Sequence, residues 1–415
     1  MSAPSPIRLA DSCSRARTLR PRSQSSTVVW WSNAVASSPP TRPQSPSMAT
    51  GRRSACCAPP RRARGSRSGF PRDPARARRF PRFRACASSD YVIPVIDIGR
   101  LASPDPGARQ ALAASIRDAA VAAGFLYVAN HGIEASVVAD AFEANRRFHA
   151  WPDERKARLR QNRWHRGYMG FGDTKLASSA NFAPARRPNR MESLMIRHEV
   201  APDHPDVLAG RPLQGPNQWP DDPWICAAIR RYDAAVVDLG QRLLPALSVA
   251  AGESPEFFLS FFRPASTALR LIHYPPSPAD RPEDLFGSHP HTDYGFLTIL
   301  AQDEVGGLEV RAHDGHWISA PPIPGTFVIN IGDALARWTN DTFRSTPHRV
   351  INASAERDRY SVAMFFDPNL DATIEPRPQH CGGRPARYEP IRYRDYYTAR
   401  LDANYARYDS SGVLR

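Results

Sequence analysis

The sequence has few cysteines and no long apolar run. It holds 6 cysteines among 415 residues, and only Cys226 and Cys381 follow residue 88. These two are too few for a disulfide framework and lack the C-x-x-C spacing of many metal sites, so a reducing compartment fits. Since no stretch of about 18 consecutive apolar residues occurs, we expect a chain that does not span a membrane.

Most of the chain also lacks an excess of positive charge, although the whole chain is basic. With 55 Lys and Arg against 41 Asp and Glu, the net charge is +14 and the pI is about 10.0. Residues 1–88 contain 18 Arg and 2 acidic residues, so this segment carries +16 and residues 89–415 carry −2. The sequence therefore does not indicate that residues 89–415 bind nucleic acid or an anionic membrane.

Residues 1–88 are rich in Arg, Ser and Pro and show no sustained apolar periodicity. Such a segment buries too little apolar surface to offset its chain entropy, so we expect it to be disordered. Its composition is that of an organellar transit peptide. The interpretation we favour is that the segment is untranslated or misassigned sequence that precedes the true start of the protein. A nucleic-acid-binding tail is an alternative that arginines alone support weakly. We expect a cytoplasmic protein, or an organellar one if the extension is a transit peptide.

Residues 89–260 combine helical and strand patterns. We expect strands at 91–97 and 125–129, helices at 108–123, 135–149 and 224–251, and an irregular polar region at 161–223. Gly124 is placed to cap the first helix, and Pro245 is expected to kink or end the third. These elements form the N-terminal region of the predicted domain organisation.

Beyond Ala268 the apolar pattern changes to a period of two. Strand candidates occur at 269–274, 295–300, 307–311, 316–319, 326–330, 348–351 and 359–365, separated by Gly, Pro, Asn and Asp. Seven such strands predict a β-rich α+β fold, in which helices flank a double-stranded β-helix (jelly-roll, cupin-like) core at 261–408. Residues 393–408 are expected to be helical.

One histidine and one carboxylate in this half have the spacing of metal ligands. His291 and Asp293 are two residues apart, so in an extended chain their side chains project to one face. His348, which opens a later strand, is the best candidate for a third ligand. Two His and one carboxylate on one face form the facial triad expected of non-haem Fe(II) enzymes, which leaves positions open for substrates and oxygen.

A candidate anion receptor follows on the last predicted strand. Arg359 and Ser361 are again two residues apart and share a face. A guanidinium beside a hydroxyl is suited to a carboxylate. If the strand faces the barrel interior, Arg359 is a buried charge that requires an anionic partner.

At this point the sequence resembles the iron- and 2-oxoglutarate-dependent oxygenases, specifically the isopenicillin N synthase-like group. The resemblance covers about residues 91–408. Its motifs occur in order as IPVID at 93–97, GFLYVANHGI at 124–133, RGY at 166–168, HYPP at 273–276, HTDYGFLT at 291–298, GGLEV at 306–310, NIGDA at 330–334, RWTN at 337–340, RSTPHRV at 344–350 and RYS at 359–361. Ten ordered matches make this resemblance specific.

The resemblance implies that His291, Asp293 and His348 bind Fe(II). It also implies that Arg359 and Ser361 bind 2-oxoglutarate, and that Tyr274 contacts this co-substrate from the neighbouring strand. O2 is the other co-substrate, and the implied reaction oxidises a small-molecule substrate, by hydroxylation as the default, with release of succinate and CO2. The sequence departs from the commonest family pattern at His273, where a tyrosine is frequent.

Alternatives remain open from sequence. They are a 2-oxoglutarate-dependent ethylene- and succinate-forming enzyme, an isopenicillin N synthase-like oxidase that does not consume 2-oxoglutarate, and a non-enzymatic, cupin-like binding protein. Arg166, Tyr168 and Arg197 could meet an acidic or polar substrate, or could be surface or packing residues. We expect His289, His313 and His316 to lie at the surface or in turns. The substrate and the oligomeric state are not indicated.

Overall fold

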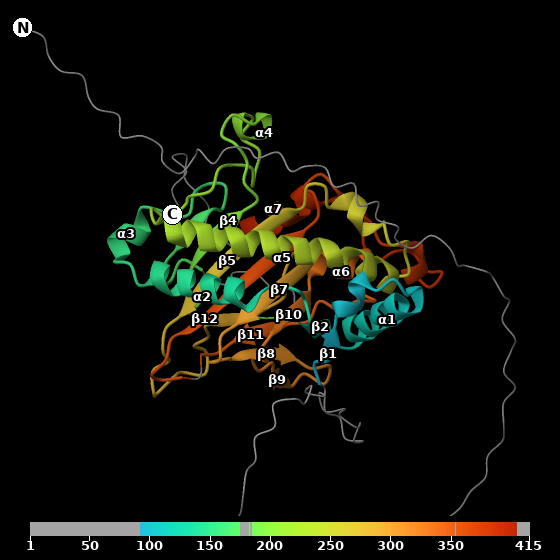
Figure 1. Ribbon diagram of the computed structural model, residues 1–415, viewed down its shortest axis with the longest axis horizontal. Helices are drawn as coiled ribbons and strands as arrows, with labels where there is room; N and C mark the ends of the chain where they lie inside the picture. The colour runs from blue at the N-terminus through green and yellow to red at the C-terminus, as the bar shows by residue number, and fades with distance from the viewer. Residues whose placement is uncertain (1–91, 175–181, 183–184, 353, 405–415) are drawn as a thin grey trace, which may run out of the picture. The chain divides into compact units, whose positions relative to one another are not determined.

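Two sheets form the core of a computed structural model, which describes residues 92–174, 182, 185–352 and 354–404 (Figure 1). The larger sheet has the strand order β1-β2-β10-β7-β12-β5-β4-β3, and the smaller has the order β6-β11-β8-β9. The larger contains β1 (Val95–Asp97), β2 (Phe125–Ala129), β3 (Gly167–Met169), β4 (Glu192–Arg197), β5 (Ser266–Tyr274), β7 (Leu297–Gln302), β10 (Thr326–Ile331) and β12 (Arg359–Asp367). The smaller contains β6 (Ser288–His291), β8 (Leu308–Arg311), β9 (Trp317–Ser319) and β11 (His348–Val350).

An apolar cluster joins the inner faces of the two sheets. It includes Phe125, Ile272 and Ala363 from the larger sheet, and Val310 and Val350 from the smaller. Because neighbouring residues of a strand point to opposite faces, each of these strands contributes every second residue to the space between the sheets. This arrangement is the predicted jelly roll.

Helices cover the outer face of the larger sheet. The long helix α5 (Pro223–Ala250) contacts α1 (Pro106–Ala122) and α2 (Ala135–His149), and α2 contacts β12 and β5. In Figure 1, α5 crosses in front of the sheet, with α2 beside it. The predicted apolar stripe of α5, which includes Ile229, Val236 and Leu243, is buried. The helices therefore support the sheet from outside and leave the space between the sheets to the site.

Short elements complete the described chain. They are α3 (Asp153–Ala157), α4 (Pro205–Leu208), α6 (Asp333–Trp338), α7 (Tyr393–Asn404), the 3-10 turns Gly99–Ala102, Phe258–Phe261 and Pro378–His380, and a two-stranded ribbon of β13 (Thr373–Ile374) and β14 (Ile391–Arg392). The helix predicted at 393–408 is confirmed over α7, and its last residues lie outside the described part. The predicted disorder of residues 1–88 also concerns residues outside it.

Most predicted elements are confirmed, but one prediction was wrong, and one of the two outcomes expected at Pro245 did not occur. The region 161–223 is not irregular throughout, because β3 and β4 extend the larger sheet beyond β5. All six residues of β4 are buried, including Glu192 and Arg197, so its sequence lacks the alternation of a half-exposed strand. Pro245 does not end α5, which continues to Ala250.

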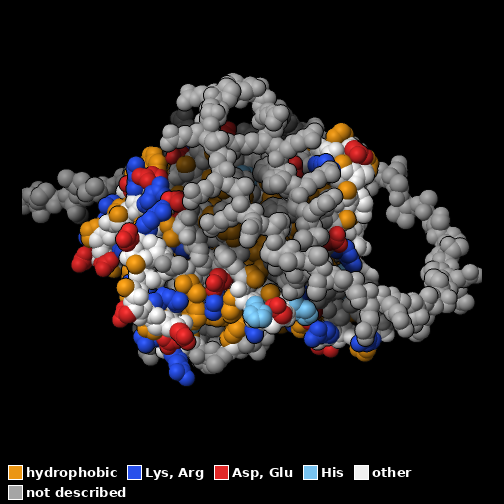
Figure 2. All heavy atoms as spheres, turned by 90° about the horizontal axis from the view of Figure 1, so that it is seen from below, with side chains coloured by type: hydrophobic (Ala, Val, Ile, Leu, Met, Phe, Trp, Pro, Cys, Tyr) orange, Lys and Arg blue, Asp and Glu red, His pale blue; other side chains and the backbone are white. Residues whose placement is uncertain are grey.

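The described helices and one face of the surface bear on the sequence expectations about membranes and charge. None of the described helices combines the length and apolar character needed to cross a bilayer. On the face drawn in Figure 2, Lys and Arg side chains lie among Asp and Glu side chains, so its described part carries no continuous basic surface. Cys226 is buried, with its Sγ 3.0 Å from the carbonyl oxygen of Pro220, and Cys381 is partly exposed.

Candidate active site

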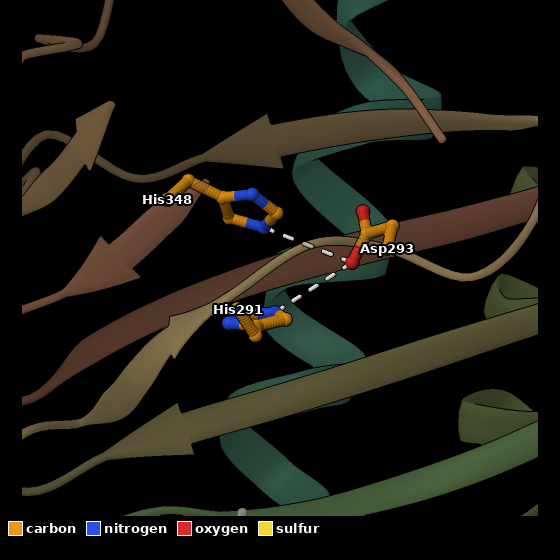
Figure 3. Close-up of side chains that lie close together, drawn as sticks. All are labelled: His291, Asp293 and His348. Carbon is orange, nitrogen blue, oxygen red and sulfur yellow. Dashed lines mark ion pairs between the residues drawn. The ribbon is translucent and has the colours of Figure 1, made fainter. Parts of the chain in front are cut away.

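His291, Asp293 and His348 lie together between the sheets (Figure 3). His291 ends β6 and is the direct cross-strand partner of His348, which begins β11. Asp293 follows β6 by two residues, so the backbone returns its side chain towards the same point. Asp293 Oδ1 is 3.6 Å from His291 Nε2 and 3.7 Å from His348 Nε2. The sequence prediction that these three residues meet is confirmed.

Backbone carbonyl groups orient both imidazole rings. His291 Nδ1 is 2.7 Å from the carbonyl oxygen of His289, and His348 Nδ1 is 3.3 Å from that of Thr346. A carbonyl oxygen only accepts hydrogen bonds, so each Nδ1 carries the proton and donates it. Each Nε2 then presents a lone pair towards Asp293, as metal-binding histidines do.

The carboxylate of Asp293 is held through one of its two oxygen atoms. Thr298 Oγ1 donates a hydrogen bond of 2.6 Å to Asp293 Oδ2, and Asn330 Nδ2 donates one of 2.7 Å to the same atom. Asp293 Oδ1 remains directed at the two imidazoles. This division leaves one carboxylate oxygen and two imidazole nitrogens for a shared cation.

The protonation states also suit a metal. Burial alone would raise the pKa of Asp293, but the charges of His348 and His291 and the hydrogen bonds it accepts outweigh burial and hold the pKa well below its ordinary value. Burial lowers the pKa of His348 to about 4, reinforced by the nearby His291. An ionised carboxylate and a neutral imidazole are the forms that bind a divalent cation, and two His with one carboxylate match non-haem Fe(II).

Arg359 lies fully buried on β12, opposite Tyr274 on β5. Its Nε donates to the carbonyl oxygen of Gly306, and its NH2 donates a hydrogen bond of 3.3 Å to Gln302 Oε1. The guanidinium carbon lies 4.6 Å from the centre of the Tyr274 ring. The buried NH1 has no hydrogen-bond partner among the described residues. A buried guanidinium with an unused donor fits an anion such as a carboxylate.

Ser361 is two residues further along β12 and points to the same side of the sheet as Arg359. It is buried and pairs with Ile272 of β5 and Gln302 of β7. Tyr274 is buried as well. The three residues that the sequence assigned to the co-substrate therefore lie on adjacent strands of one sheet, on the inner face.

A pocket opens from the metal-ligand cluster towards solvent. Its volume is about 110 Å³, and its lining includes His291, Asp293, Arg270, Phe365 and Met195. The sequence analysis did not select Arg270, Phe365 or Met195. The sequence could have indicated Arg270, because Arg270 lies four residues before Tyr274 on the same strand, and residues four apart on a strand share a face.

The structure separates the polar residues that sequence left undecided. His289 is buried and lines the pocket, with Nδ1 2.7 Å from Asn189 Oδ1, so its expected surface position was wrong. His313 and His316 are exposed, as expected. Arg166 donates to three backbone carbonyl groups and Tyr168 to Glu192, so both serve in packing. Arg197 lines the pocket.

Two family models match the chain. The model of the 2OG-Fe(II) oxygenase superfamily matches residues 265–368, and that of the non-haem dioxygenase in morphine synthesis N-terminal region matches residues 93–222. The first match contains every residue proposed above for metal and co-substrate. Neither match tests the predicted boundary between residues 260 and 261.

Curated relatives and solved structures agree with these matches. A 2-oxoglutarate-Fe(II) type oxidoreductase of Emericella nidulans is 33% identical over 323 residues, which are 76% of this chain and 90% of the relative. A homoarginine-6-hydroxylase of Arabidopsis thaliana is 33% identical over 76% of this chain and 98% of the relative. A full-length protein of Neurospora crassa, solved in complex with alpha-KG and thymine, has a TM-score of 0.66 at 30% identity, covering 76% of this chain and 98% of that one.

Proposed function

Because the chain belongs to the 2-oxoglutarate-Fe(II) oxygenase superfamily, we propose that His291, Asp293 and His348 hold its Fe(II). Arg359, Ser361 and Tyr274 bind its 2-oxoglutarate. The protein is an Fe(II)- and 2-oxoglutarate-dependent dioxygenase that oxidises a small-molecule substrate. The observation that carries the assignment of residues is the convergence of two Nε2 atoms and one Oδ1 atom at the base of the pocket.

The bound iron, with 2-oxoglutarate and O2, supplies oxidation of a substrate C–H bond coupled to conversion of 2-oxoglutarate to succinate and CO2. The chain's own residues bind and orient. The carbonyl groups of His289 and Thr346 fix the two imidazoles, and Thr298 and Asn330 fix Asp293. Arg359 pairs with the distal carboxylate of 2-oxoglutarate through its unused NH1 donor.

Hydroxylation is the reaction we propose. The names of relatives support it, since the set includes homoarginine-6-hydroxylases of Arabidopsis thaliana and of Oryza sativa. Ethylene formation and oxidation without 2-oxoglutarate find no support among these names, and the complete ligand set argues against a non-enzymatic binding protein. We further propose a substrate other than nucleic acid and no membrane association, given the charge of −2 over residues 89–415, and a cytoplasmic location.

Succinate formation tests this proposal. Purified protein with Fe(II), ascorbate and 2-oxoglutarate in air should release succinate slowly, because these enzymes also turn over without substrate, and faster when a substrate is added. A variant with His348→Ala should release none, since one of three ligands is missing. An exposed histidine provides the matched control, and His316→Ala should behave as the unaltered protein. Unaltered protein that forms no succinate would contradict the proposal.

A further inference from the structure

His273 lies on the opposite face of the larger sheet from the residues assigned to 2-oxoglutarate. It directly precedes Tyr274 on β5, and its cross-strand partner on β12 is Tyr360, which stands between Arg359 and Ser361. Because neighbouring residues of a strand point to opposite faces, His273 and Tyr360 face away from the co-substrate residues, towards α2. Their rings stack, with centroids 5.0 Å apart and planes 17° from parallel. His273 is also the position at which the sequence departs from the commonest family pattern.

Two carboxylates contact His273, one at each nitrogen of the imidazole ring. Nδ1 lies 2.7 Å from Glu192 Oε1, and Nε2 lies 2.7 Å from Asp358 Oδ1. An ionised carboxylate only accepts hydrogen bonds, so both contacts are hydrogen bonds only when the imidazole carries two protons and a positive charge. Glu192 belongs to β4, whereas Asp358 immediately precedes Arg359 at the start of β12. Protonated His273 therefore joins β4 and β5 to the residue next to Arg359.

Four further titratable groups surround this arrangement: Lys156 of α3, Tyr168 of β3, His149 of α2 and Tyr360 of β12. Lys156 and Tyr168 both donate to the second oxygen of Glu192, at 2.7 and 2.5 Å, and Lys156 also pairs with the exposed Asp153 at 3.0 Å. Burial lowers the pKa of His149 to about 3 and raises that of Tyr360 to about 12, so both rings are neutral near pH 7. Burial alone would lower the pKa of His273, but its two carboxylate partners outweigh burial and raise it.

Loss of one proton from His273 breaks one of its two hydrogen bonds. A neutral imidazole has a single N–H, so one nitrogen then presents its lone pair to a carboxylate. The side chain of Glu192 is 2% exposed and would lose its partner without access to water, whereas that of Asp358 is 45% exposed and can turn to solvent. The remaining proton therefore stays between His273 and Glu192, and Asp358 is released. The start of β12, beside Arg359, then lacks this tether.

The position of Arg359 is set from both neighbouring strands. Towards β7, its NH2 donates a hydrogen bond of 3.3 Å to Gln302 Oε1. Towards β5, it pairs with Tyr274, and one residue earlier the contact between His273 and Asp358 spans the same two strands. Its NH1, the donor left for the co-substrate, has no hydrogen-bond partner among the described residues. Since one peptide bond joins Asp358 to Arg359, a movement of Asp358 is passed to this donor.

We propose that His273 is a positioning residue whose protonated form holds Asp358 against β5 and thereby sets Arg359 for 2-oxoglutarate, so that co-substrate affinity falls when His273 loses its proton. This inference rests on the proposed function and adds a regulation of the same site by pH. His273 acts through Asp358 and does not touch the co-substrate, because it faces the other side of the sheet. The dissociation constant of 2-oxoglutarate should rise about 3- to 5-fold on deprotonation, the upper range for a half-exposed pair.

The pKa of His273 measures this coupling from the side of the proton. The chain has 12 histidines, and the imidazole NMR signal that disappears in His273→Tyr identifies residue 273. The signal is followed against pH in protein loaded with Zn(II), a diamagnetic replacement for Fe(II). We expect a pKa above the ordinary 6.5, which 2-oxoglutarate raises further because coupling between two sites is reciprocal. A pKa at or below 6.5, or one that 2-oxoglutarate does not change, would overturn the inference.

The affinity for 2-oxoglutarate measures the same coupling from the side of the co-substrate. The co-substrate is titrated into the anaerobic Fe(II) protein, and its weak visible absorption gives the dissociation constant at a pH below and a pH above the pKa of His273. The unaltered protein should show the rise of about 3- to 5-fold. His273→Tyr keeps a ring against Tyr360 but does not titrate in this range, so it should lack that rise. Equal pH dependence in the two proteins would overturn the inference.

A variant of the exposed carboxylate separates the tether from a direct effect of charge. Asp358→Asn removes the ion pair but leaves His273 and the charge of 2-oxoglutarate in place. At the lower pH it should bind 2-oxoglutarate about 3- to 5-fold more weakly, and 2-oxoglutarate should no longer raise the pKa of its His273. Asp314 pairs with His316 at 3.2 Å on the surface, so Asp314→Asn is the matched control and should behave as the unaltered protein. An unreduced effect of 2-oxoglutarate on His273 in Asp358→Asn would show a charge effect alone and overturn the inference.

These measurements distinguish the inference from the proposed function. Failure of the proposed function would appear as no visible absorption at any concentration of 2-oxoglutarate. Failure of the inference alone would appear as normal absorption, with a dissociation constant that depends on pH equally in the unaltered protein and in His273→Tyr. The absorption at saturating 2-oxoglutarate also checks the folding of each variant, because all of them retain His291, Asp293 and His348.

Discussion

At the scale of single residues, Asp293 divides its two oxygen atoms between support and metal binding. Thr298 and Asn330 both donate to Oδ2, which leaves Oδ1 for the cation. We predict that Thr298→Val lowers Fe(II) affinity about 10-fold or more, as loss of a hydrogen bond to a metal ligand does. The iron concentration for half-maximal succinate release measures this. Thr298→Ser keeps the hydroxyl and should retain the affinity; equal weakening of both variants would contradict the role of the hydroxyl.

Arg359 is expected to act on co-substrate affinity alone. Replacing it by alanine removes the charged donor from a fully buried position opposite Tyr274. We predict that Arg359→Ala raises the 2-oxoglutarate concentration for half-saturation about 10- to 100-fold while iron binding is retained. Arg359→Lys keeps the charge without the planar fork and should be intermediate. An unchanged half-saturation in Arg359→Ala would remove this residue from the co-substrate site.

The sequence was informative for residues whose partners lie two positions away. His291 with Asp293, and Arg359 with Ser361, could be predicted because alternation along a strand places such pairs on one face. The pairing of His348 with His291 depends on the register of β11 against β6, which no local pattern specifies. Arg270 and His289 were missed for a related reason, since their burial depends on which strands cover them.

At the scale of elements, the turn between α1 and β2 depends on Gly124. This residue has φ of 66°, and a Cβ atom there would lie 2.1 Å from the carbonyl oxygen of Arg344. We predict that Gly124→Ala lowers the free energy of unfolding by about 3 kcal/mol, combining backbone strain with a steric overlap. Gly252, after α5, has φ of 76° and no atom within 4 Å of such a Cβ.

Gly252→Ala is therefore the control, and it should cost only the strain of a left-handed residue, about 1 kcal/mol. Urea unfolding of the two variants and the unaltered protein measures both costs. Equal costs at Gly124 and Gly252 would show that the close approach of the Arg344 carbonyl oxygen has no energetic consequence.

A buried polar cluster ties β4 and β5 to the helical side of the sheet. His273 Nδ1 is 2.7 Å from Glu192 Oε1, and its Nε2 is 2.7 Å from Asp358 Oδ1. Burial alone would lower the pKa of His273, but these two carboxylates outweigh burial and raise it. Burial would raise the pKa of Glu192, but hydrogen bonds with His273, Lys156 and Tyr168 and the charge of His149 lower it to about 2.

These shifts define a pH window for stability. The stabilisation from protonated His273 is complete below its ordinary pKa of 6.5 and is lost as pH rises through the raised value. The stabilisation from ionised Glu192 is present above its ordinary pKa of 4.5 and is lost as the pH falls towards its lowered pKa of about 2. We predict that the difference in unfolding free energy between unaltered protein and His273→Phe is largest near pH 5.5 and falls by pH 9.

Urea unfolding of the iron-free protein at several pH values measures that difference. His149 and Glu192 interact with His273, so their titrations change with it, and the comparison reports on this polar cluster as a unit. His316→Phe, at an exposed histidine, is the control and should show no such trend. A difference between unaltered protein and His273→Phe that stays constant from pH 5.5 to 9 would contradict the raised pKa.

Strands β3 and β4 show where prediction from sequence ends at this scale. A strand covered on both faces has no alternating pattern, and β4 also contains the charged residues Glu192 and Arg197. The burial of these charges is explained by partners distant in the sequence, such as His273 for Glu192. Local propensity cannot supply such partners. By contrast, the amphipathic helices α1, α2 and α5 could be predicted almost to the residue.

At the scale of the whole molecule, the charge of the chain and the charge of the enzyme are different quantities. Residues 1–88 carry +16, whereas residues 89–415, which contain every assigned site residue, carry −2. The origin of the extension stays a prediction, which the mass of the native N-terminus would test. The location of the protein stays a prediction as well. The jelly roll itself could be predicted from its spaced short strands, but the strand order required the structure.

The absorption spectrum of the anaerobic protein tests the central claim most directly. Addition of both Fe(II) and 2-oxoglutarate should produce a weak visible band that neither produces alone, because His291, Asp293 and His348 would hold the iron beside the bound co-substrate. His291→Ala should abolish the band, while His316→Ala should retain it. A correctly folded, unaltered protein that shows no band, or an unchanged band in His291→Ala, would contradict the account.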